Sequence, residues 1–256
     1  MFHTALELLL LCAVLFVSVS GVPSKSGVNL TESFQNVYDK AMWGQEGGKS
    51  GGGSTLKSTL SIRHFLYTFI IEHDIKSFLD APCGAMVWQK AMLHHIQETH
   101  TIIYTGMDIV PSVIEDNKMA FSNEKTWSFQ WVDISSTPIV NKYDMIMSRD
   151  VFFHLTFDKI MCALNNFKNS NSKYLIATSN PGASNAYDAN SWQMRLNEGG
   201  FREVDLMAAP ISLPKPAFLL EEKEASRIMG VWELANIPTF THFNNVAINC
   251  GTVLSQ

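Results

Sequence analysis

The chain has 256 residues, of which 46% are hydrophobic and 17% are charged, and its formal net charge is −5. This is enough apolar material for one sizeable core, so we expect one domain of somewhat over two hundred residues. No block of basic residues occurs, and the composition therefore excludes the usual footprint of a nucleic-acid-binding protein.

The first expected element is an apolar N-terminal segment. Residues 8–19, LLLLCAVLFVSV, form a continuous apolar run that is shorter than the ~20 residues needed to span a bilayer. Small residues follow the run, as they do at a signal-peptide cleavage site. We therefore expect a secretory signal peptide over residues 1–21, which would direct the protein to the ER or Golgi lumen or outside the cell. Because no Lys or Arg precedes the run, an uncleaved membrane anchor and a buried helix stay open as alternatives.

Two further features bear on the compartment. Asn29-Leu30-Thr31 is an N-glycosylation sequon just beyond the expected cleavage point. Cys83, Cys162 and Cys250 would remain after cleavage, and three cysteines can form at most one bridge. This cysteine usage is that of an ordinary intracellular enzyme, which is in tension with secretion.

Residues 22–75 are expected to form N-terminal helices joined by a glycine-rich segment. Apolar residues recur with helical spacing over 28–42 and again over 60–71. Between them lies WGQEGGKSGGGST, residues 43–55, with six glycines in thirteen residues. The segment is either a flexible linker or a lid loop that closes over a ligand. The lid is suggested because Trp43 is costly to leave in water and glycine lets the backbone approach a ligand closely.

From residue 76 to residue 256 the pattern alternates between short apolar strands and helices. Strands are expected at 76–81, 101–109, 126–134, 143–151, 172–180 and 227–235. Helices are expected at 86–97, 111–122 and 157–169. Near-continuous apolar strands separated by helices predict an α/β domain with a parallel sheet that is covered on both faces. The Pro-rich segment 210–218 cannot be a central strand.

Acidic residues close several of these strands. Asp80, Asp108 and Asp133 each end a strand, and a fourth strand ends at Ser148-Arg149-Asp150. Ligands of open parallel sheets bind outside the carboxyl ends of the strands, so we expect these acids to converge on one crevice. Gly84, soon after Asp80, would let the backbone come close to the ligand.

The expected crevice suits an adenosine that carries a cationic tail. A dinucleotide site needs G-x-G-x-x-G, whereas this turn has a single glycine after an acid, so a nucleotide-binding oxidoreductase is disfavoured. Asp108 can accept hydrogen bonds from both ribose hydroxyls, and Asp133 can accept one from an adenine amine beside Ile109 and Ile134. Asp80 can meet an ammonium group. Together these properties describe S-adenosylmethionine (SAM).

Five stretches of the domain resemble the motifs of class I SAM-dependent methyltransferases, in the order FLDAPCGAMVW, YTGMDIVPSVIEDNK, FQWVDI, YDMIMSRDVFFHL and SKYLIATS. The resemblance covers residues 76–179, and it is greatest to a branch whose first motif reads Asp-Ala-Pro-Cys-Gly. It implies a Rossmann-like fold with a seven-stranded, mostly parallel sheet, helices on both faces, and SAM as the cofactor. The implied contacts are Asp80, Ala81 and Gly84 to the methionine part, Asp108 and Ile109 to the ribose, Asp133 and Ile134 to the adenine, and Ser148, Arg149 and Asp150 beside the sulfonium and the acceptor.

The expected reaction is methyl transfer to an unidentified acceptor, either a small molecule or a glycan-like one. A hydroxyl acceptor requires a general base, and Asp150 and His154 are the candidates, with Arg149 beside them. No metal is expected, because His94-His95 fit a solvated helix face. The strand-end acids could instead cap helices, Arg149 and Asp150 could form an internal ion pair, and His154 could be structural. Because the first motif keeps one glycine, the alternative is a methyltransferase fold that binds a ligand or partner without catalysis.

Overall fold

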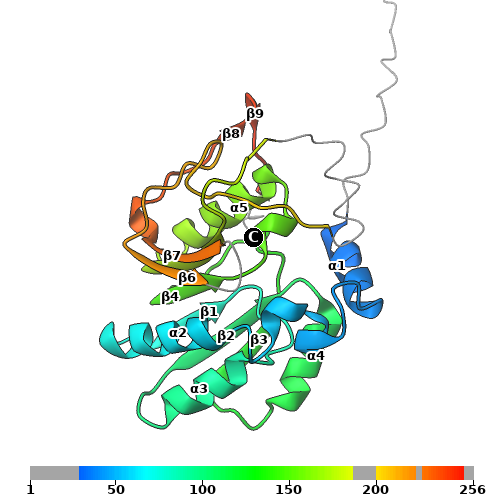
Figure 1. Cartoon of the computed structure of the whole chain (residues 1–256), viewed down its shortest axis with the longest axis vertical. Coiled ribbons are helices and arrows are strands. Elements are labelled where there is room, and N and C mark those ends of the chain that lie inside the picture. Colours follow the sequence, from blue (N-terminus) through cyan, green and yellow to red (C-terminus); the bar gives the residue numbers. More distant parts are fainter. Residues whose placement is uncertain (1–28, 187–199, 223–226, 251–256) are drawn as a thin grey trace, which may run out of the picture.

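The computed structural model describes residues 29–186, 200–222 and 227–250 (Figure 1). The expected signal peptide, residues 1–21, lies outside the described residues. Within the described ranges, no helix has both the length and the apolar character that crossing a bilayer would require.

The core of the molecule is one seven-stranded sheet in the order β3-β2-β1-β4-β5-β7-β6. Five strands are mutually parallel, namely β1 (Ser77–Asp80), β2 (Ile103–Asp108), β3 (Trp127–Trp131), β4 (Met145–Ser148) and β5 (Tyr174–Ser179). The remaining two are β7 (Arg227–Glu233), which runs antiparallel to both of its neighbours, and the edge strand β6 (Phe218–Glu222). The expected seven-stranded, mostly parallel sheet is therefore confirmed.

Helices cover both faces of this sheet, as the near-continuous apolar strands predicted. Side chains alternate along β1, so that Leu79 packs into the cluster on one face and Phe78 into the cluster on the other. Helix α5 (Phe157–Asn169) covers the Leu79 face. On the Phe78 face lie α2 (Leu60–Glu72), α3 (Gln89–Gln97) and part of α4 (Pro111–Ala120).

The N-terminal part folds onto the carboxyl ends of the strands. Helix α1 (Leu30–Asp39) begins at Asn29, whose side-chain oxygen accepts a hydrogen bond from the backbone of Glu32. It packs beside α4 (Figure 1), where Gln35 Nε2 donates to Ser112 Oγ at 2.9 Å. The glycine-rich segment that follows, residues 43–55, contains two short 3₁₀ turns, η1 (Glu46–Lys49) and η2 (Gly52–Ser54). It is thus an ordered cover of the strand ends and not an extended linker.

Two details of the last third were not expected. The Pro-rich segment leads into β6, a strand that the sequence pattern did not indicate, at the edge of the sheet where Pro is tolerated. A disulfide also joins Cys162 of α5 to Cys250, beyond the hairpin of β8 (His242–Phe243) and β9 (Val246–Ala247). Cys83 is a buried free thiol, so the three cysteines form the one bridge that their number permits.

Candidate functional site

A cavity that is partly open to solvent lies at the carboxyl ends of the parallel strands, and its empty volume, including the open solvent at its mouth, is about 930 Å³. It sits where the chain switches from β1 toward β2 on one side and toward β4 on the other, which is the usual ligand position in open α/β sheets. Strand-end loops form its floor, and α1 and the glycine-rich segment form its cover. The expected site residues that line it are Asp80, Gly84, Asp108, Ile109, Asp133, Ile134, Arg149, Asp150 and His154.

Ala81 and Ser148, two of the expected contacts, are not among the lining residues. The reason is the alternation of side chains along a strand. Asp80 and Met147 line the cavity, and the next residue in each strand points the other way. Ala81 therefore packs into the core under α5, and Ser148 is fully buried.

Asp80, the last residue of β1, is fully buried at the base of the cavity. Its Oδ2 accepts hydrogen bonds from Tyr104 Oη at 2.9 Å and from Gln89 Nε2 at 3.1 Å. Its Oδ1 is buried without any hydrogen-bond partner among the described residues. Burial raises the pKa of Asp80 to about 7, although the two donors oppose the shift. The site therefore holds a carboxylate oxygen that a donor, and above all a cation, would satisfy.

Gln89, at the start of α3, presents a second unsatisfied acceptor next to Asp80. Its Nε2 donates both to Asp80 Oδ2 and to the carbonyl of Cys83, at 2.7 Å. Because both of these neighbours only accept, the amide must turn its NH₂ group toward them. Its Oε1 is left buried and unpaired within the described part of the chain. Gln89 was not among the site residues expected from the sequence, and the signal that could have identified it is its position as a polar residue in the first turn of the helix after the first strand.

Asp108, the last residue of β2, lies beside the turn that carries Gly84. Its Oδ2 accepts from the backbone N–H of Gly84 at 3.0 Å, and its Oδ1 accepts from that of Val110, also at 3.0 Å. Burial raises the pKa of Asp108 to about 6, although these backbone donors oppose the shift. The carboxylate therefore closes the turn before α4, whose N-cap is Val110, so Asp108 is not the helix cap considered from the sequence, and it also faces the cavity.

Asp133 lies two residues beyond the end of β3 and also has a capping role. Its Oδ1 accepts from the backbone N–H of Ser135 at 2.8 Å and from the Ser135 hydroxyl at 2.7 Å. Its Oδ2 accepts from the Ser136 hydroxyl at 2.8 Å. These bonds fix the loop so that Asp133 and the apolar Ile134, together with Ile109, line one end of the cavity.

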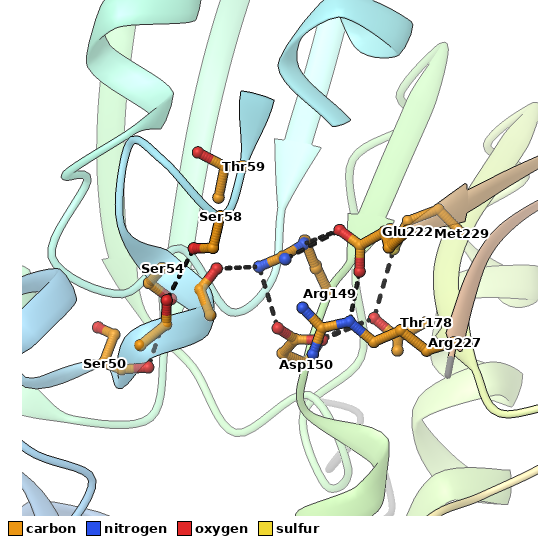
Figure 2. Close-up of polar contacts among 12 residues, drawn as sticks. Ser50, Ser54, Ser58, Thr59, Arg149, Asp150, Thr178, Glu222, Arg227 and Met229 are labelled. Atoms are coloured by element: carbon orange, nitrogen blue, oxygen red, sulfur yellow. Dashed lines mark hydrogen bonds and ion pairs between the residues drawn. The ribbon is translucent and has the colours of Figure 1, made fainter. Parts of the chain in front are cut away.

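The end of β4 supplies two charged residues that form ion pairs inside the protein (Figure 2). Arg149 pairs with Asp150, Nη1 to Oδ2 at 3.0 Å, and with Glu222 of β6, Nη2 to Oε1 at 2.9 Å. Arg227 of β7 pairs with the other oxygen of Asp150, Nη1 to Oδ1 at 3.2 Å, and its Nε pairs with Glu222 Oε2. Burial lowers the pKa of Arg149, but Asp150 and Glu222 outweigh it and leave the pKa above its ordinary value. The internal ion pair considered from the sequence is therefore present, and both oxygens of Asp150 are engaged by cations.

His154 ends a 3₁₀ turn, η3 (Phe152–His154), and its ring lies against the cover of the cavity. Its Nδ1 lies 2.7 Å from the carbonyl of Gly200, which can only accept, so Nδ1 carries the proton and Nε2 keeps its lone pair. Burial lowers the pKa of His154 to about 4, so the ring is neutral near pH 7. Trp43 of the glycine-rich segment stacks on it, with ring centroids 4.6 Å apart, and Phe34 of α1 meets it edge-on.

The cover contributes polar groups as well as rings. Tyr38 of α1 and Ser50 share a short hydrogen bond through their hydroxyls. Burial raises the pKa of Tyr38 well above its ordinary value. Gly84 has a left-handed backbone, φ 54°, and a Cβ there would lie 2.9 Å from Ser50 Oγ. Glycine at this position therefore lets the cover approach the strand-end turn.

No site for a metal ion is found among the described residues, where no cluster of three His, Cys, Asp or Glu side chains occurs. His94 pairs with Glu124 on the protein surface, and His95 is likewise exposed.

Comparison with known proteins shows the fold. No family model matches the sequence, and no curated protein matches it significantly. Among solved structures, human N-acetylserotonin methyltransferase in complex with SAM is 13% identical with a TM-score of 0.54, over 81% of this chain and 59% of that one. The N-methyltransferase NodS from Bradyrhizobium japonicum with S-adenosyl-L-homocysteine is 13% identical with a TM-score of 0.53, over 78% and 98% of the two chains. Magnesium protoporphyrin IX methyltransferase from Synechocystis with bound SAM is 11% identical with a TM-score of 0.51, over 82% of this chain and 98% of that one.

Proposed function

We propose that this chain, which has the fold of the class I SAM-dependent methyltransferases, binds SAM and transfers its methyl group to a small-molecule acceptor. The observation that carries the proposal is the buried Asp80 Oδ1, which has no partner among the described residues and belongs to a residue that lines the cavity. Three structural neighbours with the same fold were solved with SAM or its product S-adenosyl-L-homocysteine (SAH) bound.

The lining residues fit SAM in charge and in shape. Among the described residues that line the cavity, the carboxylates are Asp80, Asp108, Asp133 and Asp150, and the one full cation is Arg149. Such a surplus of negative charge favours a cationic ligand. The methionine ammonium would satisfy Asp80 Oδ1 and Gln89 Oε1, which are buried and lack a partner among the described residues. Asp108 would hold the ribose hydroxyls, and the adenine would lie at the end formed by Asp133, Ile109 and Ile134.

When bound, SAM supplies a methyl group on a positively charged sulfur. The protein's own contribution is to orient the acceptor, exclude water and receive a proton. His154 Nε2 is the base that the geometry favours, since its lone pair is unprotonated near pH 7. Asp150 is a poorer candidate, because Arg149 and Arg227 engage both of its oxygens.

The surroundings of His154 indicate the kind of acceptor. A base with so low a pKa is a weak one, so a phenol, with a pKa of about 10, is a better acceptor for it than an alcohol, whose proton is less acidic. Trp43, Phe34 and Leu155 give this end of the cavity flat apolar walls. We therefore favour a small, flat, apolar acceptor over a glycan-like one.

The alternative is a methyltransferase fold that binds a ligand without catalysis. The stack of Trp43 on His154 favours this alternative, because the Trp43 ring covers the candidate base.

Calorimetry with SAH tests binding. SAH formation from SAM, with cell extract as the source of acceptor, tests turnover. His154→Gln keeps the hydrogen bond to Gly200 in reach but replaces the base, so it should retain SAH binding and lose product formation. No SAH binding by the wild-type protein would refute the proposal, whereas binding with no turnover would select the alternative.

We also propose that the protein enters the secretory pathway. The Cys162–Cys250 disulfide supports this, because such bonds persist in oxidising compartments. The sequon at Asn29 has an exposed asparagine that a glycan can occupy. In the full chain expressed in eukaryotic cells, N-glycosidase should increase the electrophoretic mobility of the wild type and of Thr31→Ser, and leave Thr31→Ala unchanged. A wild type with no glycan and fully reduced thiols would contradict a secretory location.

A further inference from the structure

Four charged side chains from three strands meet beneath the glycine-rich segment. Arg149 and Asp150 follow β4, Glu222 ends β6 and Arg227 begins β7. We call them the four-charge cluster (Figure 2). The cluster has two cations and two anions, and the Arg149 and Glu222 side chains are each only 4% exposed. The two positive and two negative charges balance, so the cluster adds no net charge to the site.

Glu222 and Arg227 fix the direction in which Arg149 points. Glu222 Oε1 accepts from both Nε and Nη2 of Arg149, at 3.2 and 2.9 Å. Arg227 in turn bridges Glu222 and Asp150. Because the guanidinium is planar, holding Nε and Nη2 also fixes the directions of the two N–H groups of Nη1, and one of these faces Asp150 Oδ2.

The second N–H group of Nη1 points to the cover of the cavity. Arg149 Nη1 donates to the carbonyl of Gly53 at 3.1 Å. Gly53 also lies close against the cluster, since a Cβ built on it would be 3.1 Å from Asp150 Oδ2 and 3.5 Å from Arg227 Nη2. The same segment places Trp43, Ser50 and Ser54 over the cavity. A charge-assisted hydrogen bond thus joins the sheet to the cover.

Buried ion pairs are weak evidence for stability, because desolvation offsets their attraction. The cluster is explained better by the contact that it makes. Glu222 and Arg227 do not line the cavity, yet Glu222 holds Arg149, which bonds to the cover, and Arg227 holds both Glu222 and Asp150. We propose that Glu222 and Arg227 are positioning residues, which aim Arg149 at Gly53 and thereby keep the glycine-rich segment closed over the bound cofactor. The identity of that cofactor rests on the proposed function, whereas the closing contact does not.

The test is the double variant Glu222→Gln/Arg227→Gln, which removes one charge of each sign and leaves the Arg149–Asp150 pair. Hydrogen–deuterium exchange is measured without ligand on the amides of residues 43–55, among them Ser50 and Ser54, whose N–H groups bond within the segment. We expect exchange there to become roughly tenfold faster, the effect of losing one charge-assisted hydrogen bond. The matched control is Glu115→Gln/Lys118→Gln, which removes an exposed ion pair on α4 and should leave this segment unchanged.

SAH binding kinetics give the second measurement. A cover that opens more often should let SAH associate and dissociate faster in the double variant, whereas both rates should stay unchanged in the control variant.

Unchanged hydrogen–deuterium exchange in residues 43–55 of a folded double variant would overturn the proposal. If the double variant does not fold, Arg149→Lys keeps the charge but cannot reach Gly53 and both carboxylates together, and it must show the same faster exchange. Absence of SAH binding by the wild type would refute the proposed function, and the exchange measurement without ligand would still decide the role of the cluster.

Discussion

Replacing Asp80 by Asn should stabilise the free protein at alkaline pH and abolish binding of SAH. Asp80 is fully buried, and burial raises its pKa from 3.8 to about 7. Each pKa unit corresponds to 1.36 kcal/mol, so the ionised carboxylate costs the folded state on the order of 4 kcal/mol above pH 7. Asn keeps an oxygen for Tyr104 and Gln89, and it exchanges an unpaired buried acceptor for an unpaired donor, so its other effects on stability should nearly cancel.

The sign of the pH dependence follows from the direction of this shift. The folded state holds the Asp80 proton more tightly than the unfolded state, so wild-type stability falls as the pH rises from about 4 through about 7. The gain in Asp80→Asn should therefore be about 4 kcal/mol at pH 8 and below about 2 kcal/mol at pH 5. Urea unfolding of both proteins at the two pH values, without ligand, measures the difference. A variant that is less stable than the wild type at pH 8, or that still binds SAH normally, would refute the reasoning.

Two further predictions concern ligand binding and the disulfide. SAH affinity should fall by about tenfold or more between pH 8 and pH 5.5, because a protonated Asp80 no longer attracts the ammonium; calorimetry at both pH values measures this, and a constant affinity would speak against that contact. Cys162→Ser/Cys250→Ser should lower the free energy of unfolding by about 4–5 kcal/mol, because the bridge spans 88 residues. Denaturant titration measures this loss; reducing agent should lower the stability of the wild type to that of the variant and leave the variant unchanged.

The central part of the fold could be predicted from the sequence because its signals are local. Each strand from residue 76 to 180 is a short apolar run, and each helix between them repeats apolar residues with helical spacing. The structure has these elements in the expected places, with α5 at Phe157–Asn169 as expected. Because parallel strands present their carboxyl ends at one edge, the position of Asp80, Asp108 and Asp133 around one crevice also followed from chain order alone.

What each acid does there was beyond the sequence. Asp80 keeps a buried oxygen without a partner among the described residues, whereas Asp133 uses both of its oxygens to fix its own loop. The difference arises from which donors fold against each carboxylate, Tyr104 and Gln89 in one case and the two serines after Asp133 in the other. Side-chain alternation likewise removed Ala81 and Ser148 from the cavity wall.

The sequence by itself determined the alternation of strands and helices, the apolar strand cores and the acids at the strand ends, since all of these depend on neighbours a few residues apart. Only the tertiary structure decided that the glycine-rich segment covers the cavity, that Glu222 meets Arg149 and that Arg227 meets Asp150, each more than 70 positions earlier in the chain. Those contacts depend on the order of strands in the sheet, which places β7 antiparallel beside β5 and β6 antiparallel beside β7 at the edge. No local pattern of charge or hydrophobicity encodes that order, because many strand orders bury the same apolar residues equally well.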